Sequence, residues 1–348
     1  MAKAKLSLLI AVILFAATTA QTQPADSLPE KYVKKVLIEA KWGDGPGEFG
    51  ITPTLEQFKQ MVKQHGSVCG EIYGPDYFDI DESGNIYILD QINKRVQLFD
   101  QDGEFIGMLG VESRCHTIIA GKKKSLFTVT PIKEITVGGQ NSIVFRFDHF
   151  NSDRKMEDQF TVEFDRKGEF ATNIWERFIT DPQGDIWFIN KSVNSLVPIT
   201  LNGKVINKVV TKEIKDNLKK PLLTISNGEN IVNCDTKNIE ITNDKKSEII
   251  KKIPFDNNKY NFSEIIGVDE DDNIYVKVGY WYTKPIKMYI LKYNKDGRLL
   301  AKIEAYDRDS DQMPVATRRW SLVDKNGNIY CLTTMPIKGF IFGKWSKQ

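Results

Sequence analysis

Residues Asp79 to Asp90 have the spacing of a calcium-binding loop. Acids stand at the first, third and twelfth positions, and Gly84 stands at the sixth, where a calcium loop turns sharply. Such a loop needs a helix on each side, whereas Gly74-Pro75 precedes this segment and an alternating strand pattern follows it. Three similar segments elsewhere in the chain lack the final acid. We therefore predict a tight hairpin turn here, with calcium ligation as the alternative.

Other catalytic signatures are missing from the sequence. The chain contains no Gly-x-Ser-x-Gly turn and no phosphate-binding loop. Its turn acids are spread at wide intervals, so no pair of carboxylates for hydrolysis is evident. These features favour a protein without a cofactor or resident metal, and a binding protein rather than an enzyme.

Basic and aromatic residues recur just upstream of short apolar runs. Seven of them form the candidate ligand-binding set: Tyr77, Arg114, His116, Arg177, Lys220, Arg319 and Trp320. Guanidinium groups interleaved with aromatic rings suit a carboxylate, a sugar acid or an acidic peptide tail. The alternative is that each cation is solvated or paired with an acid such as Glu112 or Glu176, and that the aromatic rings belong to the core.

A recurring sequence phrase must position these residues. Four clear copies begin at Asp81, Asp181, Asp269 and Asp324. Each reads Asp, two variable residues, Gly or Asp, Asn or Asp, Ile, and then Tyr or Trp. Asp bonds its own backbone, Gly, Asn and Asp accept a positive φ, and the Ile-aromatic pair begins a return strand. Each copy therefore predicts a β-hairpin.

Two weaker copies lie in the gaps, at 124–127 and 229–232. The aliphatic residues of the six copies are Ile86, Leu126, Ile186, Ile231, Ile274 and Ile329, at spacings of 40, 60, 45, 43 and 55 residues. Such periods are typical of the four-stranded blades of a propeller. The sequence predicts an all-β fold, a six-bladed β-propeller.

The last repeat lacks an outer strand, because 19 residues follow Ile329. Residues 35–42 have strand character and no partner nearby in the sequence. We expect this N-terminal strand to close the sixth blade, since closure hides the two edges of an open array. One short inserted helix is predicted at 54–66 from its capping-box spacing and apolar face. A second helical pattern lies at 212–218.

The first repeat resembles an NHL repeat. The resemblance rests on Gly74-Pro75, the Asp turn at 81–87, Asp90-x-x-Asn93-x-Arg95-Val96 and Phe99-Asp-x-Asp-Gly103. Residues 42–50, Trp-Gly-Asp-Gly-Pro-Gly-Glu-Phe-Gly, are similar to the segment that opens many secreted bacterial six-bladed propellers. The resemblance is strong over 35–110, moderate around the other three Asp turns, and poor over 112–159 and 211–254. It implies a fold and says little about function, because the motif specifies turns and strands.

Some propeller lyases that resemble NHL proteins hold a metal on several pore-facing histidines. This chain has three histidines, His65, His116 and His149. Only His116, at the start of the predicted second inner strand, is well placed. His65 ends the predicted helix and His149 lies in an irregular insertion, so a three-histidine metal site would require all three to converge.

The first 20 residues have the layout of a secretory signal peptide. Lys3 and Lys5 precede a run of 12 mostly apolar residues, and small residues follow at 18–20. A spanning helix needs about 20 apolar residues, so an uncleaved anchor is the weaker alternative. We predict a cleaved signal peptide at 1–20, a flexible segment at 21–34 and the propeller at 35–348, in a secreted or periplasmic protein.

Export permits disulfide formation. Cys69 and Cys115 lie in the segments that lead into adjacent predicted blades, on one face of the disc, and we predict that they form a disulfide. Two separate thiols are the alternative, because sequence does not fix their geometry. Cys234 and Cys331 are predicted to be buried thiols.

The composition and net charge limit the classes of partner that the chain is expected to bind. The 348 residues are 41% hydrophobic and 27% charged, as in an ordinary globular protein. The net charge is +2, and it falls to zero when the signal peptide with Lys3 and Lys5 is removed. A neutral chain lacks the field that nucleic acid or an anionic membrane requires.

Two functions remain open. The first is a secreted, monomeric, non-enzymatic binding module that recognises an extracellular or periplasmic protein, peptide or glycan with the rim of its central channel. The second is a metal-assisted propeller lyase or lactone hydrolase that uses His116 or a channel-facing Asp as base. RNA binding, as in cytoplasmic NHL proteins, conflicts with the signal peptide and the zero charge.

Overall fold

The computed structural model describes residues 28–65, 72–137, 140–165, 178–180, 185–190, 195–201, 204–205, 208–209, 224–225, 230–234, 238–243, 248–255, 260, 262–279, 287–307, 315–316, 319, 321–335 and 339–348. These residues form β-strands, the turns between them and one α-helix. No helix among them is long and apolar enough to cross a membrane.

The first predicted repeat folds as one antiparallel sheet. Its strands, in consecutive order, are β3 (Tyr77–Ile80), β4 (Ile86–Asp90), β5 (Arg95–Phe99) and β6 (Phe105–Gly110). Every residue of β4 and β5 is buried, so both faces of the sheet are covered. Gly84, in the β3–β4 turn, has φ of +84°, and Gly103, in the β5–β6 turn, has φ of +91°. Glycine adopts this conformation at no steric cost.

Three further sheets have four antiparallel strands. The first contains β17 (Thr224–Ile225), β18 (Asn230–Cys234), β19 (Asn238–Asn243) and β20 (Glu248–Pro254). The second contains β21 (Phe262–Val268), β22 (Ile274–Gly279), β23 (Lys287–Tyr293) and β24 (Leu299–Asp307). The third has the order β26 (Ser321–Val323), β27 (Ile329–Met335), β28 (Gly339–Lys347) and β1 (Tyr32–Ala40).

The remaining described strands form larger and smaller sheets. A five-stranded sheet contains β7 (Thr117–Ala120), β8 (Leu126–Val137), β9 (Gln140–Phe150), β10 (Met156–Asp165) and β16 (Lys208–Val209), and the 3-10 turn η2 (Lys122–Lys124) joins β7 to β8. A three-stranded sheet contains β11 (Phe178–Thr180), β12 (Ile186–Asn190) and β13 (Ser195–Pro198). Two short pairs are β14 (Thr200–Leu201) with β15 (Lys204–Val205), and β2 (Ile72–Tyr73) with β25 (Val315–Ala316).

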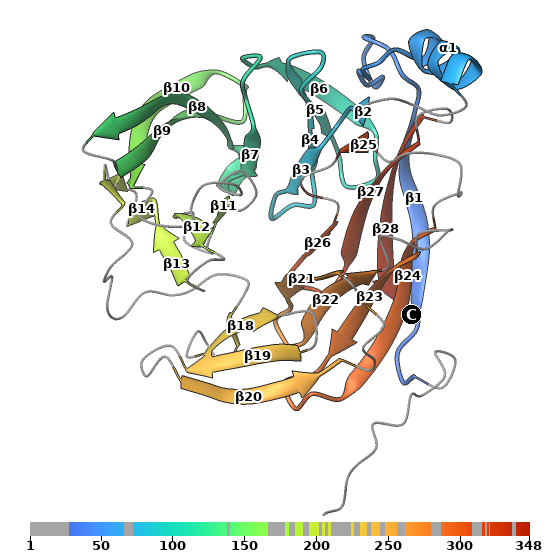
Figure 1. Cartoon of the computed structure of the whole chain (residues 1–348), viewed down its shortest axis with the longest axis vertical. Helices are drawn as coiled ribbons and strands as arrows, with labels where there is room; N and C mark the ends of the chain where they lie inside the picture. The colour runs from blue at the N-terminus through green and yellow to red at the C-terminus, as the bar shows by residue number, and fades with distance from the viewer. Residues whose placement is uncertain are drawn as a thin grey trace, which may run out of the picture.

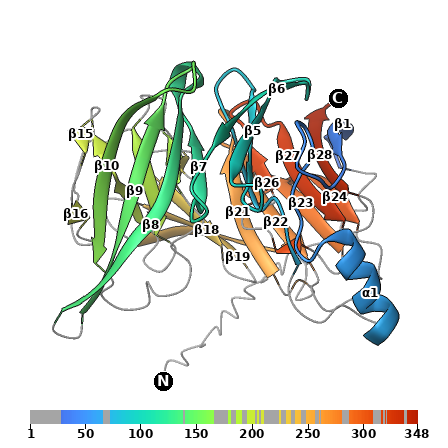
Figure 2. The ribbon, with the colours of Figure 1, turned by 90° about the horizontal axis from the view of Figure 1, so that it is seen from above.

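The sheets are arranged as the blades of a β-propeller (Figures 1 and 2). The strands β3, β7, β11, β21 and β26 lie nearest the centre (Figure 1). The innermost strands of neighbouring sheets touch one another: β3 contacts β7, β7 contacts β11, and β21 contacts β26. β21 also contacts β18, the second strand of the preceding sheet. The described residues therefore form an all-β propeller with one α-helix. Within the described residues, four sheets are complete four-stranded blades.

The chain's first described strand closes the last of these blades. β1 pairs antiparallel with β28 from Tyr32 opposite Lys347 to Ala40 opposite Phe340, and the two strands run together along one edge of the molecule (Figure 1). The predicted closing strand is confirmed, and it begins at Tyr32 rather than at residue 35. Ile38 and Ala40 are buried while Glu39 between them is exposed, which is the alternation of a half-buried strand.

The segment that follows β1 is fastened to the first blade. Arg95 donates hydrogen bonds to the carbonyl oxygens of Asp44, Gly45 and Glu48, at 2.6, 2.9 and 2.8 Å. Its Nε lies 2.9 Å from Asp90 Oδ2, so a buried ion pair holds the guanidinium in place. We call residues 43–50 the latch, because these bonds fix it to the blade.

The predicted inserted helix is α1 (Leu55–His65). The Thr54 backbone N–H donates to Gln57 Oε1 at 2.8 Å, and the Gln57 N–H donates to Thr54 Oγ1 at 3.3 Å. This reciprocal pair is the expected capping box and explains where the helix begins. The helix lies at the periphery of the propeller (Figure 2). The second helical pattern, at 212–218, lies outside the described residues.

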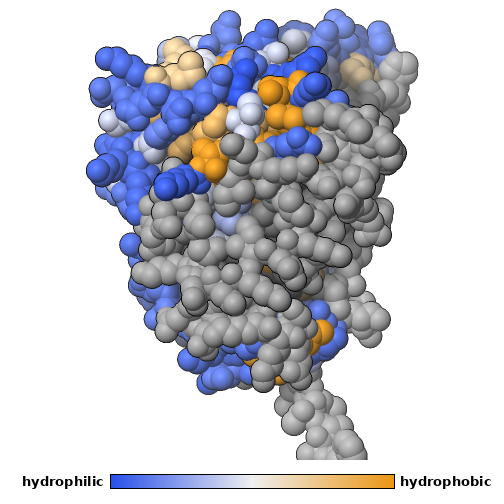
Figure 3. Space-filling view, turned by 90° about the vertical axis from the view of Figure 1, so that its left-hand side faces the viewer, coloured by the Kyte–Doolittle hydropathy of each residue, from blue (hydrophilic) through white to orange (hydrophobic). Residues whose placement is uncertain are grey.

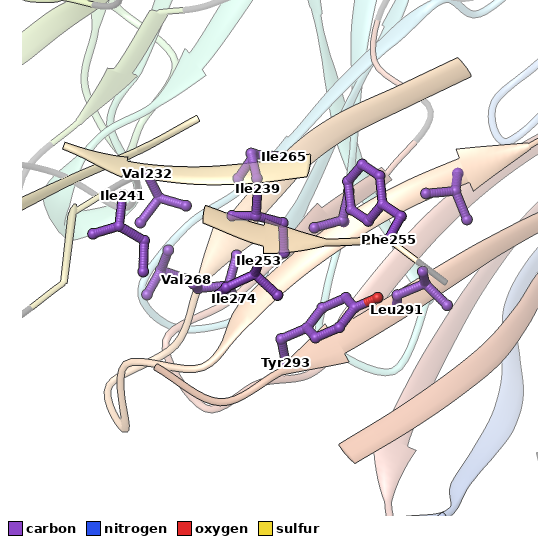
Figure 4. Packing of buried hydrophobic residues seen from close by; sticks show 12 residues of the cluster. Val232, Ile239, Ile241, Ile253, Phe255, Ile265, Val268, Ile274, Leu291 and Tyr293 are labelled. Atoms are coloured by element: carbon purple, nitrogen blue, oxygen red, sulfur yellow. The ribbon is translucent and has the colours of Figure 1, made fainter. Parts of the chain in front are cut away.

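Apolar clusters fill the space between neighbouring sheets. Figure 4 shows one of them, in which Ile239 and Ile253 from one blade pack against Ile265, Ile274 and other residues of the next. Equivalent clusters lie between the first blade and the β7–β10 sheet and between the last and first blades. Such sheet-to-sheet burial stabilises a propeller without one central core. On the side face drawn in Figure 3, the described surface is mostly hydrophilic with small apolar patches.

Candidate functional site

The three Asp turns that the structure describes, at Asp81, Asp269 and Asp324, are each held by the carboxylate that opens the turn. Asp81 Oδ1 accepts the backbone N–H groups of Ser83 and Asn85, both at 2.9 Å. Asp81 Oδ2 accepts the Asn85 amide at 2.8 Å and the Tyr87 hydroxyl at 3.1 Å. Asp269 and Asp324 make the same bonds to residues two, four and six positions later. In these three copies the phrase is therefore a turn in which one acid, buried or partly buried, holds both strands.

These bonds favour the hairpin interpretation of residues 79–90. The three acids at loop positions one, three and twelve already accept protein donors. Asp79 accepts from Arg319, Asp81 accepts within its turn, and Asp90 accepts from Arg95. β3 and β4 flank the turn as paired strands. Among the described residues, no three His, Cys, Asp or Glu side chains form a cluster that could hold a metal ion.

A cavity of about 780 Å³ lies at the centre of the propeller, among the Asp turns. We call the face that carries these turns the turn face, and the opposite face, where the inner strands begin, the start face. Turn residues from four sheets line the cavity: Asp81, Glu82, Ser83, Gly84, Gly121, Lys122, Asp269, Glu270, Asp324, Lys325 and Asn326. The volume falls in the range of small-molecule binding sites.

Equivalent residues from five sheets line the cavity. Ile80, Ala120, Thr180, Val268 and Val323 all line it, and each is the last residue of an inner strand. Because the repeats share one register, the same position from five sheets meets around one axis. Ala120, Val268 and Val323 are buried in the apolar clusters between the sheets, so Ile80 and Thr180 are the members of this set with partly exposed side chains.

An ion pair forms part of the cavity wall. Arg319 Nη1 lies 2.9 Å from Asp79 Oδ1, and both side chains are about nine-tenths buried. Arg319 Nη2 donates to the Phe178 carbonyl at 3.2 Å, and the guanidinium lies 4.4 Å over the ring of Tyr77. Asp79 Oδ2 accepts the Ala120 N–H at 2.8 Å.

The pair therefore ties four sheets together. Arg319 precedes β26, Asp79 belongs to β3, and their partners belong to β7 and β11. Burial raises the pKa of the Asp79 carboxyl, although the Arg319 charge and the Ala120 N–H oppose that shift. Charge-assisted hydrogen bonds in a buried site are strong and directional, so the pair has a fixed geometry at the cavity wall.

The predicted ligand-binding residues are distributed between the two faces. Arg319 and Tyr77 lie together at the channel, where Tyr77 is fully buried. Arg114 is exposed and His116 is partly buried on the start face. Arg177, Lys220 and Trp320 lie outside the described residues. Glu112, considered as a partner for the rim cations, lies 2.8 Å from Arg146, which the sequence did not single out.

The predicted histidine and cysteine sites have separate surroundings. His149 stacks on Phe127 at 4.3 Å between ring centres, on the third strand out from the channel. His65 ends α1, away from the centre, and its side chain is outside the description. Cys115 is buried with its sulfur 3.6 Å from the Thr117 carbonyl oxygen, and Cys69 lies outside the described residues, so the disulfide stays a prediction.

Cys331 is the most sharply defined thiol. It is buried in β27, and burial raises the pKa of its thiol to about 12. This thiol is therefore protonated and unreactive at neutral pH, which confirms the prediction of a buried structural cysteine.

Sequence reasoning missed Asp79 as a cavity residue and considered it only as a calcium ligand. A signal was available, since Asp79 is an acid in the middle of an otherwise apolar inner strand, Tyr77–Ile80. A buried acid requires a partner. The identity of that partner was hidden, because Arg319 lies 240 positions away in the sequence.

The fold and cavity define a β-propeller with a ligand-sized cavity at its centre. No protein-family model matches the chain, and no curated protein matches it. Among solved structures, a streptogramin B lyase is similar with 12% identity and a TM-score of 0.46, over 91% of this chain and 98% of that one.

Two further solved structures are similar at the same low level. A catalytically inactive virginiamycin B lyase from Staphylococcus aureus, with quinupristin, has 11% identity and a TM-score of 0.44, over 91% of this chain and 99% of that one. A gluconolactonase from Xanthomonas campestris has 10% identity and a TM-score of 0.44, over 79% and 87%. These likenesses assign no activity to this chain.

Proposed function

We propose that the chain is an exported, monomeric, non-enzymatic six-bladed propeller that binds a polar ligand in its central cavity. The observation that carries the proposal is the cavity itself, which has charged and polar turn residues at its mouth and the fixed Asp79–Arg319 pair in its wall. A few placed polar groups within a concave apolar site are typical of ligand recognition.

The six-blade count has support from both the sequence and the sheets. Six copies of the turn phrase are present, and four of them fall in complete four-stranded blades. The other two fall in the β7–β10 and β11–β13 sheets, whose first strands contact each other. A ring of six NHL-like repeats would be closed by the pairing of β1 with β28.

Export is supported by the residues before the propeller. The basic, apolar and small-residue regions at 1–20 fit a cleaved signal peptide. The resulting neutral chain disfavours nucleic acid as a partner. Secretion or periplasmic location would present the cavity to ligands outside the cytoplasm.

A thermal-shift screen with two blocking variants tests the proposal. Purified protein is heated with a library of sugars, amino acids and dicarboxylates, since a ligand of the folded state raises the melting temperature. Ser83→Trp adds a large side chain at the exposed edge of the cavity, and Ser113→Trp adds the same side chain on the start face. We expect shifts that Ser83→Trp abolishes and Ser113→Trp preserves.

The reverse pattern would contradict the cavity as the binding site. Shifts that survive Ser83→Trp and disappear in Ser113→Trp would move binding to the start face, near Arg114 and His116. If no compound in the library raises the melting temperature of a protein that melts cooperatively, that result would contradict small-ligand binding.

Asp79 supports a second candidate, a metal-assisted lyase or lactone hydrolase. Its buried carboxyl lines the cavity and has a raised pKa, as a general base near neutral pH requires. A lactone panel assayed with added zinc or calcium tests this candidate. Turnover that Asp79→Asn abolishes, in a variant that still melts cooperatively, would replace the binding function with an enzymatic one.

A further inference from the structure

The repeat brings one sequence position from several blades to the cavity mouth. Glu82, Lys122, Glu270 and Lys325 each lie two residues after the end of an inner strand, and all four line the cavity. Each also precedes by four residues the aliphatic residue of its repeat. The equivalent positions of the other two repeats are Pro182 and Asn227, which lie outside the described residues and carry no charge.

These four side chains form a mouth without net charge. Two carboxylates and two ammonium groups are present, all on exposed residues. Among the described residues no ion pair joins them to one another or to a neighbour. Within the part of the chain that the structure describes, the only hydrogen bond of their charged atoms is the one that Glu82 Oε1 accepts from the Lys123 backbone N–H at 3.3 Å. The mouth therefore offers both strong acceptors and strong donors to an incoming molecule.

The other charges of the cavity are already engaged within the protein. Arg319 is bonded to Asp79 and to a backbone carbonyl, and Asp81, Asp269 and Asp324 hold their own turns. Lys344 lies 5.4 Å over the ring of Tyr330. An anion in the cavity would meet two unpaired carboxylates at the mouth, and the buried guanidinium could bind it only by giving up Asp79.

We propose that this mouth binds a neutral oligosaccharide, an inference that rests on the proposed binding function and names its ligand class. A sugar hydroxyl donates and accepts at once, so adjacent hydroxyls can donate to Glu82 or Glu270 while others accept from Lys122 or Lys325. The C–H face of the sugar then lies against the partly exposed side chain of Ile80, at the end of β3. A cavity of about 780 Å³ has room for such a ligand.

The test is titration calorimetry with ligands from a glycan array of neutral and acidic oligosaccharides. We expect a neutral oligosaccharide to bind, and Glu270→Ala and Lys325→Ala each to weaken it by about tenfold or more, since each removes a charge-assisted hydrogen bond. Glu104→Ala and Lys295→Ala are matched controls, because both residues are exposed in turns outside the cavity. These two variants should bind like the wild type.

Three results would overturn the inference. A uronic-acid oligomer or an acidic peptide that binds more tightly after Glu270→Ala would show an anion site, and the proposed binding function would stand. A neutral oligosaccharide whose affinity is the same in all four variants would bind elsewhere. An array without any bound glycan, alongside a thermal shift that Ser83→Trp abolishes, would keep the cavity function and remove the sugar.

Discussion

The carboxylate of Asp81 accepts four hydrogen bonds from three residues of its own turn, and both of its oxygens are used. The Tyr87 hydroxyl is one of the donors, and burial together with the Asp81 charge raises its pKa above the ordinary value, so it remains a donor at any physiological pH. This network links β3 to β4 through side chains as well as through the backbone ladder. It explains why Asp and Tyr recur six positions apart in three described turns.

Replacing Asp81 should therefore cost more than a surface change. Asp81→Ala leaves the Ser83 and Asn85 N–H groups and the Tyr87 hydroxyl without their acceptor, and we expect the free energy of unfolding to fall by about 3 kcal/mol. Urea unfolding measures the difference. Asp102→Ala is the control, because Asp102 is exposed and pairs only with exposed Lys35. Equal stabilities of the two variants would contradict the structural role of the turn acid.

Glu30 makes the free energy of unfolding depend on pH in the acidic range. Burial alone would raise its pKa, but hydrogen bonds from Lys292 and Lys347, at 2.8 and 2.9 Å, together with their charges, hold the pKa below its ordinary 4.5. A lowered folded-state pKa means that the stabilisation is complete above the unfolded value and is lost as the pH falls through the folded value. Glu30→Gln should remove this contribution.

The measurement is the free energy of unfolding from pH 7 to pH 3, in the wild type and Glu30→Gln. We expect the wild type to be more stable at pH 7 and the two curves to converge below pH 4.5. Curves that stay parallel over the whole range would show that Glu30 has the same pKa in both states.

At the scale of the element, two glycines allow neighbouring segments to approach β1. Gly339, at the start of β28, has φ of +113°, and a Cβ there would overlap the carbonyl oxygen of Ala40. Gly103, in the β5–β6 turn, has φ of +91°, and a Cβ would overlap the Leu37 carbonyl. Both sites combine a left-handed backbone with close contact.

Gly339→Ala should destabilise the protein by about 2 kcal/mol, since the backbone strain alone costs about 1–2 kcal/mol and the overlap adds to it. Gly110→Ala is the matched control, because it has no positive φ and nothing lies within 4 Å of the added Cβ. Thermal or urea unfolding compares the two. If Gly110→Ala is the more damaging change, the packing of β28 against β1 is not as the structure shows.

The same elements show what could be predicted from the sequence. The turn phrase, the capping box at Thr54 and the missing outer strand are local or countable features, so the hairpins, α1 and the β1–β28 pair followed from them. The pairing of Asp79 with Arg319 depends on how the sheets meet around the axis, which no local pattern encodes. For that reason the predicted set combined Arg114 and His116, which lie on the start face, with Arg319, which lines the cavity among the turns.

At the scale of the whole molecule, β1 and the latch join the beginning of the chain to both neighbours of the closing seam. β1 completes the sheet of β26, β27 and β28, and the latch is bonded to Arg95 in the first blade. Phe49 of the latch is fully buried, with its ring 4.3 Å from that of Phe340 and 6.2 Å from that of Phe99. One aromatic side chain therefore packs against the last and first blades at once.

Removing this join should change how the propeller unfolds. A chain that begins at residue 43 lacks β1, exposes the edge of β28 and uncovers the apolar residues beneath Ile38, whereas a chain that begins at residue 28 retains all of them. We expect the shorter chain to melt over a broad range at a lower temperature and to have a smaller urea dependence of unfolding, because less surface is buried in its folded state. The longer chain should melt in one sharp transition. If both chains melt alike by calorimetry, β1 does not close the propeller, and the bonds between the latch and Arg95 have to hold the seam without it.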